Sequence, residues 1–284
     1  MEPIPSPDPN PRRLLVLTGD VFIVPRIEDV ARGGGFEVHI LDRPEAIGAA
    51  GGATARAIPL TEPLEGADAA WIRWLVLNRP GLIAVDIADD YLPWERWIAI
   101  LKSSAATRRI PVLAFGPHVD EGRLRAAERA GADRVLARGE FLGNLAGLLS
   151  EWARVPDAAA LARACQGRLS DVARQGVELI NAGEYFEAHE VLEKALKDAP
   201  EADGYLYRTL LQVAVTLLQL ERGNPRGARK MLLRIRQWLD PLPEECQGID
   251  LRPVRTLVGE LEADLDKAIQ PPRARPRFQI HLSG

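Results

Sequence analysis

Hydrophobic and polar positions follow two different periods in the two parts of the chain. Between Leu14 and about Trp152, short continuous aliphatic runs are separated by helix-length segments, and the runs cover residues 14–17, 36–41, 82–87, 110–115 and 134–137. Continuous apolar runs suit strands buried on both faces, and helical spacers imply right-handed crossovers between parallel strands. The pattern therefore predicts a doubly wound α/β domain with a parallel five-stranded sheet.

After about Pro156 the strand signals stop, and helical patterns rich in Ala, Leu, Glu and Arg take over. The pattern breaks at Gly183, Ala199-Pro200, Gly223-Asn224-Pro225 and Pro241-Leu242-Pro243. Gly183 and Gly223 are each followed five residues later by an alanine, at Ala188 and Ala228. Small residues at helix contacts and a glycine at the turn are typical of helix-turn-helix repeats. This part is predicted to be an all-α helical bundle with tetratricopeptide-like helix pairs.

These periods set the expected domain boundaries. We expect a proline-rich disordered leader at 1–12, the α/β domain at 13–153, the helical bundle at 168–270 and a tail at 271–284 that carries Arg273, Arg275 and Arg277. The stretch 43–80 is long for a single crossover. Four of the six tryptophans fall within 27 residues, at positions 71, 74, 94 and 97. We predict that they pack in the core, with an exposed aromatic surface for a partner as the alternative.

Composition excludes several classes of protein. The net charge is −4 and the basic residues are dispersed, so no nucleic-acid partner is expected. No run of about 18 apolar residues and no signal peptide is present, so we expect no membrane partner. The two cysteines, Cys165 and Cys246, lie far apart without CxxC spacing, which argues against a zinc ribbon or a disulfide framework. A reducing cytoplasmic location fits this cysteine usage best.

The first half carries residues that resemble a known family. Val85-Asp86, the segment 110–116 and the segment 130–138 are similar to strands three, four and five of a response-regulator receiver domain, over about residues 12–152. The resemblance implies that Asp86 stands at the phosphoryl-acceptor position. Phosphoryl transfer needs a metal ion and a cation to neutralise charge on the phosphoryl oxygens.

The rest of the receiver pattern is largely missing. Thr18-Gly19 stand where the resemblance implies an acidic pair, Gly116 replaces a hydroxyl residue, and Arg138 replaces a lysine. Asp20 could supply one carboxylate, but a single loop ligand makes a poor Mg²⁺ site. We therefore predict a degenerate receiver (a pseudo-receiver) that is not phosphorylated and acts as a fixed interaction surface, with Asp86 as a polar residue at the ligand-facing edge of the sheet.

The acidic segment 184–198 is predicted to form an amphipathic helix. Tyr185, Ala188, Leu192, Ala195 and Leu196 share one face, with His189 at its margin and Glu193 one turn later. Glu190 faces the other way. The next helix, 206–220, is apolar apart from a stripe at Arg208, Gln212, Thr216 and Gln219. His189, Glu193, Gln212 and Glu190 form the candidate polar site, and His189 and Glu193 are the candidate metal ligands.

Three segments carry a second resemblance, at 186–193, at Gln212-x-Ala214 and at 222–228. Together they are similar to the bacterial family called domain of unknown function 309, over about residues 168–269. The resemblance implies an all-α bundle without an established reaction. It also implies that Leu196 and Gln219 replace an aromatic residue and a histidine. If that histidine served as a metal ligand, this chain has lost it, and glutamine is a weak substitute.

Two functions follow as hypotheses. The first is a cytoplasmic regulatory or scaffold protein in signalling, without enzymatic activity or cofactor, that binds a protein partner or itself. The second is a metal-binding protein or metal-dependent enzyme that uses His189 and Glu193. A lone HExxE lacks the second histidine of a zinc protease and the repeated Glu-x-x-His of a di-iron bundle, which favours the first hypothesis.

Overall fold

The structure is a computed structural model that describes residues 12–47, 64, 66–266 and 278–282. The chain divides into two compact units, Pro11–Val155 and a unit that begins at Pro156. The predicted leader lies outside the described residues except for Arg12, as do 48–63 of the long crossover and the three arginines expected in the tail. No helix in the described ranges combines the length and the apolar character that crossing a membrane requires.

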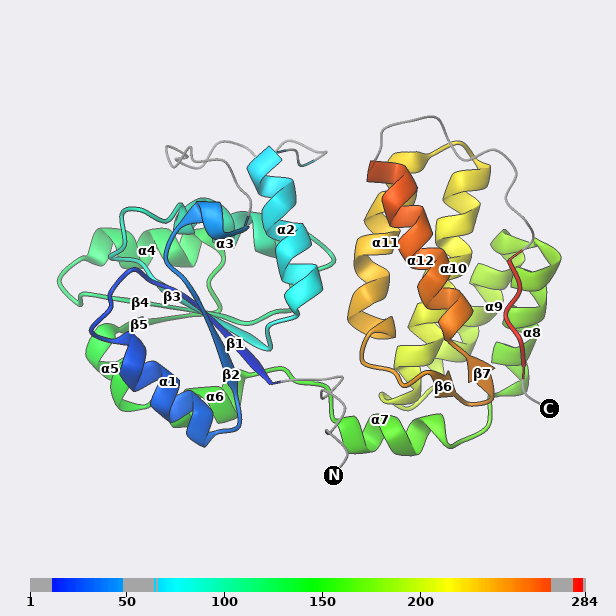
Figure 1. The fold of residues 1–284 in the computed structure, drawn as a ribbon, viewed down its shortest axis with the longest axis horizontal. Coiled ribbons are helices and arrows are strands. Elements are labelled where there is room, and N and C mark those ends of the chain that lie inside the picture. The colour runs from blue at the N-terminus through cyan, green and yellow to red at the C-terminus, as the bar shows by residue number, and fades with distance from the viewer. Residues whose placement is uncertain (1–11, 48–63, 65, 267–277, 283–284) are drawn as a thin grey trace, which may run out of the picture. The chain divides into compact units, whose positions relative to one another are not determined.

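The first unit is a doubly wound α/β fold (Figure 1). Its elements in chain order are β1 (Arg13–Leu17), α1 (Val24–Gly33), β2 (Glu37–Leu41), η1 (Pro44–Ile47), α2 (Gly66–Asn78), β3 (Leu82–Asp86), α3 (Trp94–Ser103), β4 (Val112–Gly116), α4 (Glu121–Ala130), β5 (Arg134–Ala137), α5 (Arg138–Gly143) and α6 (Leu145–Trp152). The five strands are all parallel in the order β2-β1-β3-β4-β5. This order confirms the predicted fold class and is the flavodoxin-like order of doubly wound sheets.

Helices cover both faces of this sheet (Figure 1). On one face, α1, α5 and α6 pack on alternate strand residues such as Val16, Ala84 and Phe115, and Phe115 stacks on Phe141 with ring centroids 4.1 Å apart. On the other face lie α2, α3 and α4, where Trp71 stacks on Trp97 at 4.6 Å. Both of these tryptophans are at most 2 % exposed, which confirms their predicted role in the core.

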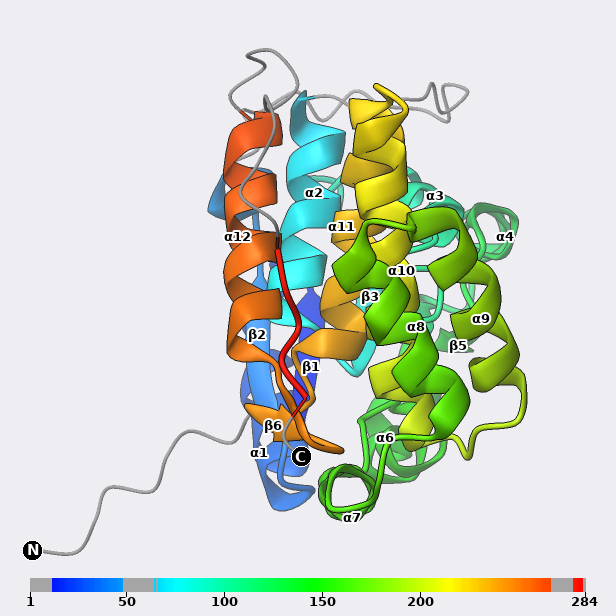
Figure 2. The same cartoon turned by 90° about the vertical axis from the view of Figure 1, so that its right-hand side faces the viewer.

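The second unit is helical. Its elements are α7 (Ala158–Cys165), α8 (Asp171–Ala182), α9 (Tyr185–Lys197), α10 (Asp203–Glu221), α11 (Pro225–Leu239), the short strands β6 (Glu245–Cys246) and β7 (Ile249–Asp250), and α12 (Arg252–Asp266). From α8 to α12, each helix packs on the next helix in the chain (Figure 2). The central helix α10 is buried along most of its length, as its apolar sequence predicts. The tetratricopeptide-like pairing stays a prediction.

Turn residues at the predicted breaks separate these helices. Gly183, with φ of 88°, ends α8, and Gly223, with φ of 66°, follows α10. Both conformations are left-handed and favour glycine. Asn224 caps α11 by accepting a hydrogen bond from the Gly227 N–H, with Pro225 at the first helical position.

Two features of this unit were not predicted. The strands β6 and β7 form a hairpin, and its two-residue turn, Gln247-Gly248, has positive φ at both positions, as a type I′ turn requires. Further along, Ile280 exchanges two hydrogen bonds with the Asn181 side chain, and Leu282 forms a bridge with Ile249 (Figure 2). Part of the segment expected to be a tail therefore packs on the helical unit.

Cys165 and Cys246 form a disulfide across a sequence separation of 81 residues. The prediction that these two cysteines would not be cross-linked is wrong. Spacing in the sequence does not measure distance in space, and the hairpin brings Cys246 back to the end of α7. Pairing of distant cysteines depends on the tertiary fold alone.

Candidate functional site

The candidate site lies at the carboxyl ends of β1 and β3. The chain order reverses between these two neighbouring strands, and ligands of open α/β sheets bind at such switch points. Thr18 and Asp20 follow β1, while Asp86 ends β3 and is 2 % exposed. Arg138 begins α5 directly after β5. Three segments far apart in the sequence thus bring polar groups to one edge of the sheet.

Both carboxylate oxygens of Asp86 have hydrogen-bond donors from the protein. Arg138 Nη2 donates to Oδ1 at 3.1 Å and to Oδ2 at 2.8 Å. The Ala88 N–H donates to Oδ1 and the Thr18 hydroxyl donates to Oδ2, each at 3.1 Å. The buried carboxylate is therefore held by one guanidinium, one hydroxyl and one backbone amide, as a buried charge requires.

The same guanidinium also holds the nearest second acid. Arg138 Nη1 donates to Asp20 Oδ2 at 2.6 Å, so Arg138 bridges Asp20 and Asp86. The position that the receiver resemblance assigns to a lysine thus carries a planar cation with enough donors for two carboxylates. Asp20 is consequently committed to an ion pair inside the protein.

Burial dominates the protonation behaviour of Asp86. Loss of hydration raises the pKa of the Asp86 carboxyl above its ordinary value, while the Ala88 N–H, the Arg138 guanidinium and the Thr18 hydroxyl lower it in part. Those three donors stabilise the charged form of the Asp86 carboxyl.

Two glycines explain why the chain departs from the receiver pattern. A Cβ atom built on Gly116 would lie 2.6 Å from Cγ1 of Ile87, so a serine or threonine does not fit there without displacing Ile87. A Cβ on Gly19 would lie 3.0 Å from Oδ2 of Asp89, which accepts the Gly19 N–H at 2.6 Å. An acidic residue at position 19 would crowd that carboxylate.

Further ion pairs fix the loops around the site. Arg123 of α4 donates to the Ile87 carbonyl at 2.9 Å and to Asp90 at 2.6 Å, and it also pairs with Asp120. With Arg138 on Asp20 and Gly19 on Asp89, these contacts connect the loops after β1, β3 and β4. The edge of the sheet is thus held in one arrangement by the protein's own charges.

Four exposed apolar side chains on these loops were not predicted from the sequence. Six large apolar side chains are exposed in the described part of the chain, and four of them lie after β1, β3 and β4, at Val21, Phe22, Tyr91 and Val119. We call these four residues the exposed rim. Phe22 is 91 % exposed and Tyr91 82 %. No local pattern in the sequence distinguished them, because single exposed apolar residues are common on protein surfaces.

The residues proposed for a site in the helical unit lie in different environments. Gln212 of α10 is 5 % exposed, His189 of α9 is half-buried, and Glu190 and Glu193 are exposed. Among the described residues, no hydrogen bond or ion pair connects His189, Glu190 or Glu193 to Gln212. The Gln212 side-chain oxygen is buried and has no hydrogen-bond partner in that part of the chain.

The polar side chains of the stripe along α10 interact with nearby groups of the helical unit. The Thr216 hydroxyl donates to the Gln212 carbonyl at 2.7 Å, one turn earlier in the helix. Gln219 accepts a hydrogen bond from the Asn224 side chain at 2.7 Å. The Arg208 guanidinium lies 4.6 Å from the centroid of the Trp238 ring. Over residues 12–47, 64, 66–266 and 278–282, no group of three or more His, Cys, Asp and Glu side chains is arranged to hold a metal ion.

Residues 173–231 match the family model described as "Domain of unknown function (DUF309)". The match covers most of α8, all of α9 and α10 and the first part of α11, which confirms the resemblance of the helical unit. No curated protein matches the chain.

The solved structures that match the chain include response regulators and a receiver domain. The phosphorylated cyanobacterial phytochrome response regulator RcpA is 14 % identical, with a TM-score of 0.39, over 52 % of this chain and 99 % of its own. The magnesium-bound receiver domain of a sensor histidine kinase from Pseudomonas aeruginosa is 16 % identical, with a TM-score of 0.38, over 50 % and 97 %. A putative response regulator from Chloroflexus aurantiacus is 19 % identical, with a TM-score of 0.36, over 50 % and 99 %.

Proposed function

We propose that the chain is a non-enzymatic regulatory or scaffold protein. Its receiver-like unit presents a fixed protein-binding surface without phosphorylation, and its helical unit binds another protein or a second copy of the chain. A single observation carries the proposal: Arg138 holds both Asp20 and Asp86 at the edge where phosphoryl chemistry would occur.

The charges around Asp86 and the occupation of its oxygens both support a role without phosphorylation. Phosphoryl transfer to a carboxylate needs a free oxygen and cations that neutralise the developing charge. Here both Asp86 oxygens are already hydrogen-bonded, to the Arg138 guanidinium, the Thr18 hydroxyl and the Ala88 N–H. Asp20, the other carboxylate that Arg138 contacts, is engaged by the same cation. The ion pairs of Arg138 with Asp20 and Asp86 therefore support a role for this edge of the sheet as a fixed binding surface.

The exposed rim supports the choice of a protein partner. Phe22 and Tyr91 stand on loops that ion pairs hold in position, so contact with a partner would cost little ordering of the backbone. The exposed carboxylates of Asp90 and Glu121 are paired with Arg123 and Arg125 inside the protein. The exposed apolar side chains therefore suit an apolar face of a protein partner.

Exposure to a small acyl phosphate with Mg²⁺ tests the proposal. We expect the intact mass of the protein to stay unchanged, whereas a phosphorylatable receiver treated in the same tube gains one phosphoryl group. Asp86→Asn is the matched control. A phosphoryl adduct on the wild-type chain that this variant lacks would contradict the proposal.

The cytoplasmic location expected from the sequence is kept in this proposal. In that compartment, low-molecular-weight thiols and dithiol proteins would act on the Cys165–Cys246 disulfide.

A further inference from the structure

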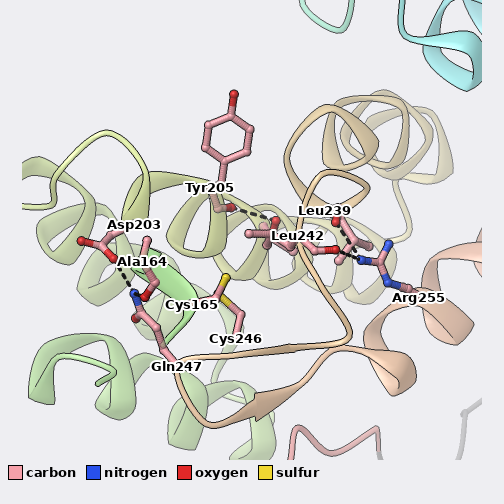
Figure 3. The surroundings of a disulfide bond; sticks show 10 residues. Ala164, Cys165, Asp203, Tyr205, Leu239, Leu242, Cys246, Gln247 and Arg255 are labelled. Carbon is pink, nitrogen blue, oxygen red and sulfur yellow. Dashed lines mark hydrogen bonds between the residues drawn. A yellow bond between two sulfur atoms is a disulfide. The ribbon is translucent and has the colours of Figure 1, made fainter. Parts of the chain in front are cut away.

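The disulfide joins two segments that differ in how firmly the rest of the helical unit holds them. Cys165 is the last residue of α7, and Cys246 is the last residue of β6, with their sulfur atoms 2.12 Å apart (Figure 3). Cys246 is 1 % exposed and belongs to the apolar core, whereas Cys165 is partly exposed. The bond therefore connects the interior of the bundle to a segment at its surface.

The hairpin has its own anchors in the bundle. Ile249 and Leu251 are fully buried beside Cys246. Arg255, in the first turn of α12, donates hydrogen bonds to the carbonyls of Leu239 and Leu242 (Figure 3). These contacts do not involve α7, so we expect β6 and β7 to keep their place when the disulfide is reduced.

The helix α7 has far weaker attachment. Leu161 is its one buried residue, and the buried Leu169 follows it before α8 begins. Besides the disulfide, Gln247 holds the end of α7. Its backbone N–H donates to the Cys165 carbonyl at 2.7 Å, and its side-chain amide donates to the Ala164 carbonyl at 3.2 Å and to Asp203 at 2.6 Å (Figure 3). A short helix with so little buried apolar area is marginally stable on its own.

We infer that Cys165–Cys246 is a reversible thiol–disulfide site that latches α7 onto the helical unit. α7 is the first helix of the helical unit and follows the boundary at Val155 and Pro156, so the disulfide controls how firmly the start of this unit is tied to the bundle. The inference rests on the cytoplasmic setting of the proposed function, because disulfides in that compartment are usually transient or redox-sensing.

The chemistry consumes two thiols of a reductant. A reductant thiolate attacks Sγ of Cys165, the less buried of the two residues, forms a mixed disulfide there and expels the Cys246 thiolate, which takes up a proton. A second reductant thiolate attacks the outer sulfur of that mixed disulfide and releases the Cys165 thiolate, which is protonated in turn. The products are two cysteine thiols and one oxidised reductant disulfide. An oxidant of the disulfide class reverses both steps.

After reduction, α7 keeps its hydrogen bonds with Gln247 and the buried side chain of Leu161. Release of residues 156–169 would give the connection between the units a span of roughly 20 Å as a free chain. The hairpin and helices α8–α12 keep their packing, because their anchors do not depend on α7. The predicted readout is therefore local: α7 opens and the bundle does not.

Limited trypsin digestion of the full chain tests the inference. Arg163 and Arg168 are exposed arginines on and just after α7, and Arg26 on α1 is an exposed arginine in the other unit. We expect cleavage after Arg163 and Arg168 to accelerate about tenfold after treatment with a phosphine reductant, while cleavage after Arg26 is unchanged. Reoxidation with oxidised glutathione should restore the slow rate.

Cys165→Ser, Cys246→Ser and the double variant separate loss of the bond from other effects of the reductant. All three should digest rapidly at Arg163 and Arg168 without reductant, and the reductant should not change their rates. The far-ultraviolet circular dichroism of the reduced chain should keep its helical signal. Equal digestion of the oxidised and reduced chains would overturn the inference. So would unfolding of the bundle on reduction, because the bond would then be a structural cross-link. Neither result bears on phosphorylation of Asp86.

Discussion

At the scale of single residues, space and charge at one edge of the sheet decide what this unit can do. Gly116 leaves no room for the hydroxyl residue that the receiver pattern has there, because Ile87 fills the space. Arg138 supplies the positive charge that Asp20 and Asp86 need. Each departure from the receiver pattern is thus compensated by a neighbouring side chain, so no single substitution restores that pattern.

Gly116→Ser should therefore destabilise the protein. The added atoms meet the Ile87 side chain in a buried strand, and overpacking of this kind costs about 1–3 kcal/mol of unfolding free energy. Urea denaturation measures the loss. Gly143→Ser serves as the matched control, since a Cβ at Gly143 meets no atom within 4 Å. Equal stability of the two variants would mean that position 116 tolerates a hydroxyl residue.

A pH prediction follows from the buried carboxyl. Because burial raises the pKa of Asp86, the folded protein binds the proton more tightly than the unfolded chain does. The stability that this group contributes is present below its unfolded pKa of about 4 and is lost as pH rises through the higher folded value. The unfolding free energy of wild type minus that of Asp86→Asn should fall with rising pH, by about 1.4 kcal/mol per unit of pKa difference. An ion pair with Arg138 that outweighed burial would give the opposite slope.

At the scale of elements, α10 explains why the polar positions of the helical unit do not by themselves define a site. Thr216 bonds the backbone of its own helix, and Gln219 bonds the Asn224 cap of α11. His189 and Glu193 lie on α9, where the predicted inward face is formed by Ala188, Leu192 and Ala195. The amphipathic pattern therefore predicted the buried face correctly, while a shared role for the polar residues stays a prediction.

Gln212→Leu tests whether the buried amide serves packing or a ligand. Its side-chain oxygen is buried without a partner in the described structure, so replacing the amide with an apolar group of similar size should leave the unfolding free energy equal or raise it by about 1 kcal/mol. Thermal or urea unfolding gives the value. The control is Gln219→Leu, which removes a formed hydrogen bond to Asn224 and should be destabilising. A loss above about 1 kcal/mol in Gln212→Leu would show that the amide makes a stabilising interaction.

At the scale of the whole molecule, one chain combines two units stabilised in different ways. The α/β unit depends on a sheet buried on both faces and on ion pairs at its edge. The helical unit depends on one apolar core, into which the hairpin and the segment 278–282 also pack. The disulfide ties the helix that follows the first unit to that core.

The sequence by itself determined the periodic features of this protein. The apolar runs around Val16, Val85 and Leu113 specified the strands, and Gly183, Gly223 and Pro225 specified helix ends, because burial period and backbone freedom are local properties of the chain. Only the tertiary structure decided which distant groups meet. Contacts between separate segments produce the Arg138 bridge, the exclusion of a side chain at Gly116 by Ile87 and the Cys165–Cys246 bond. The exposed rim depends on which side chains the packed fold leaves uncovered. Such contacts follow from how the elements pack in space, which no local pattern records.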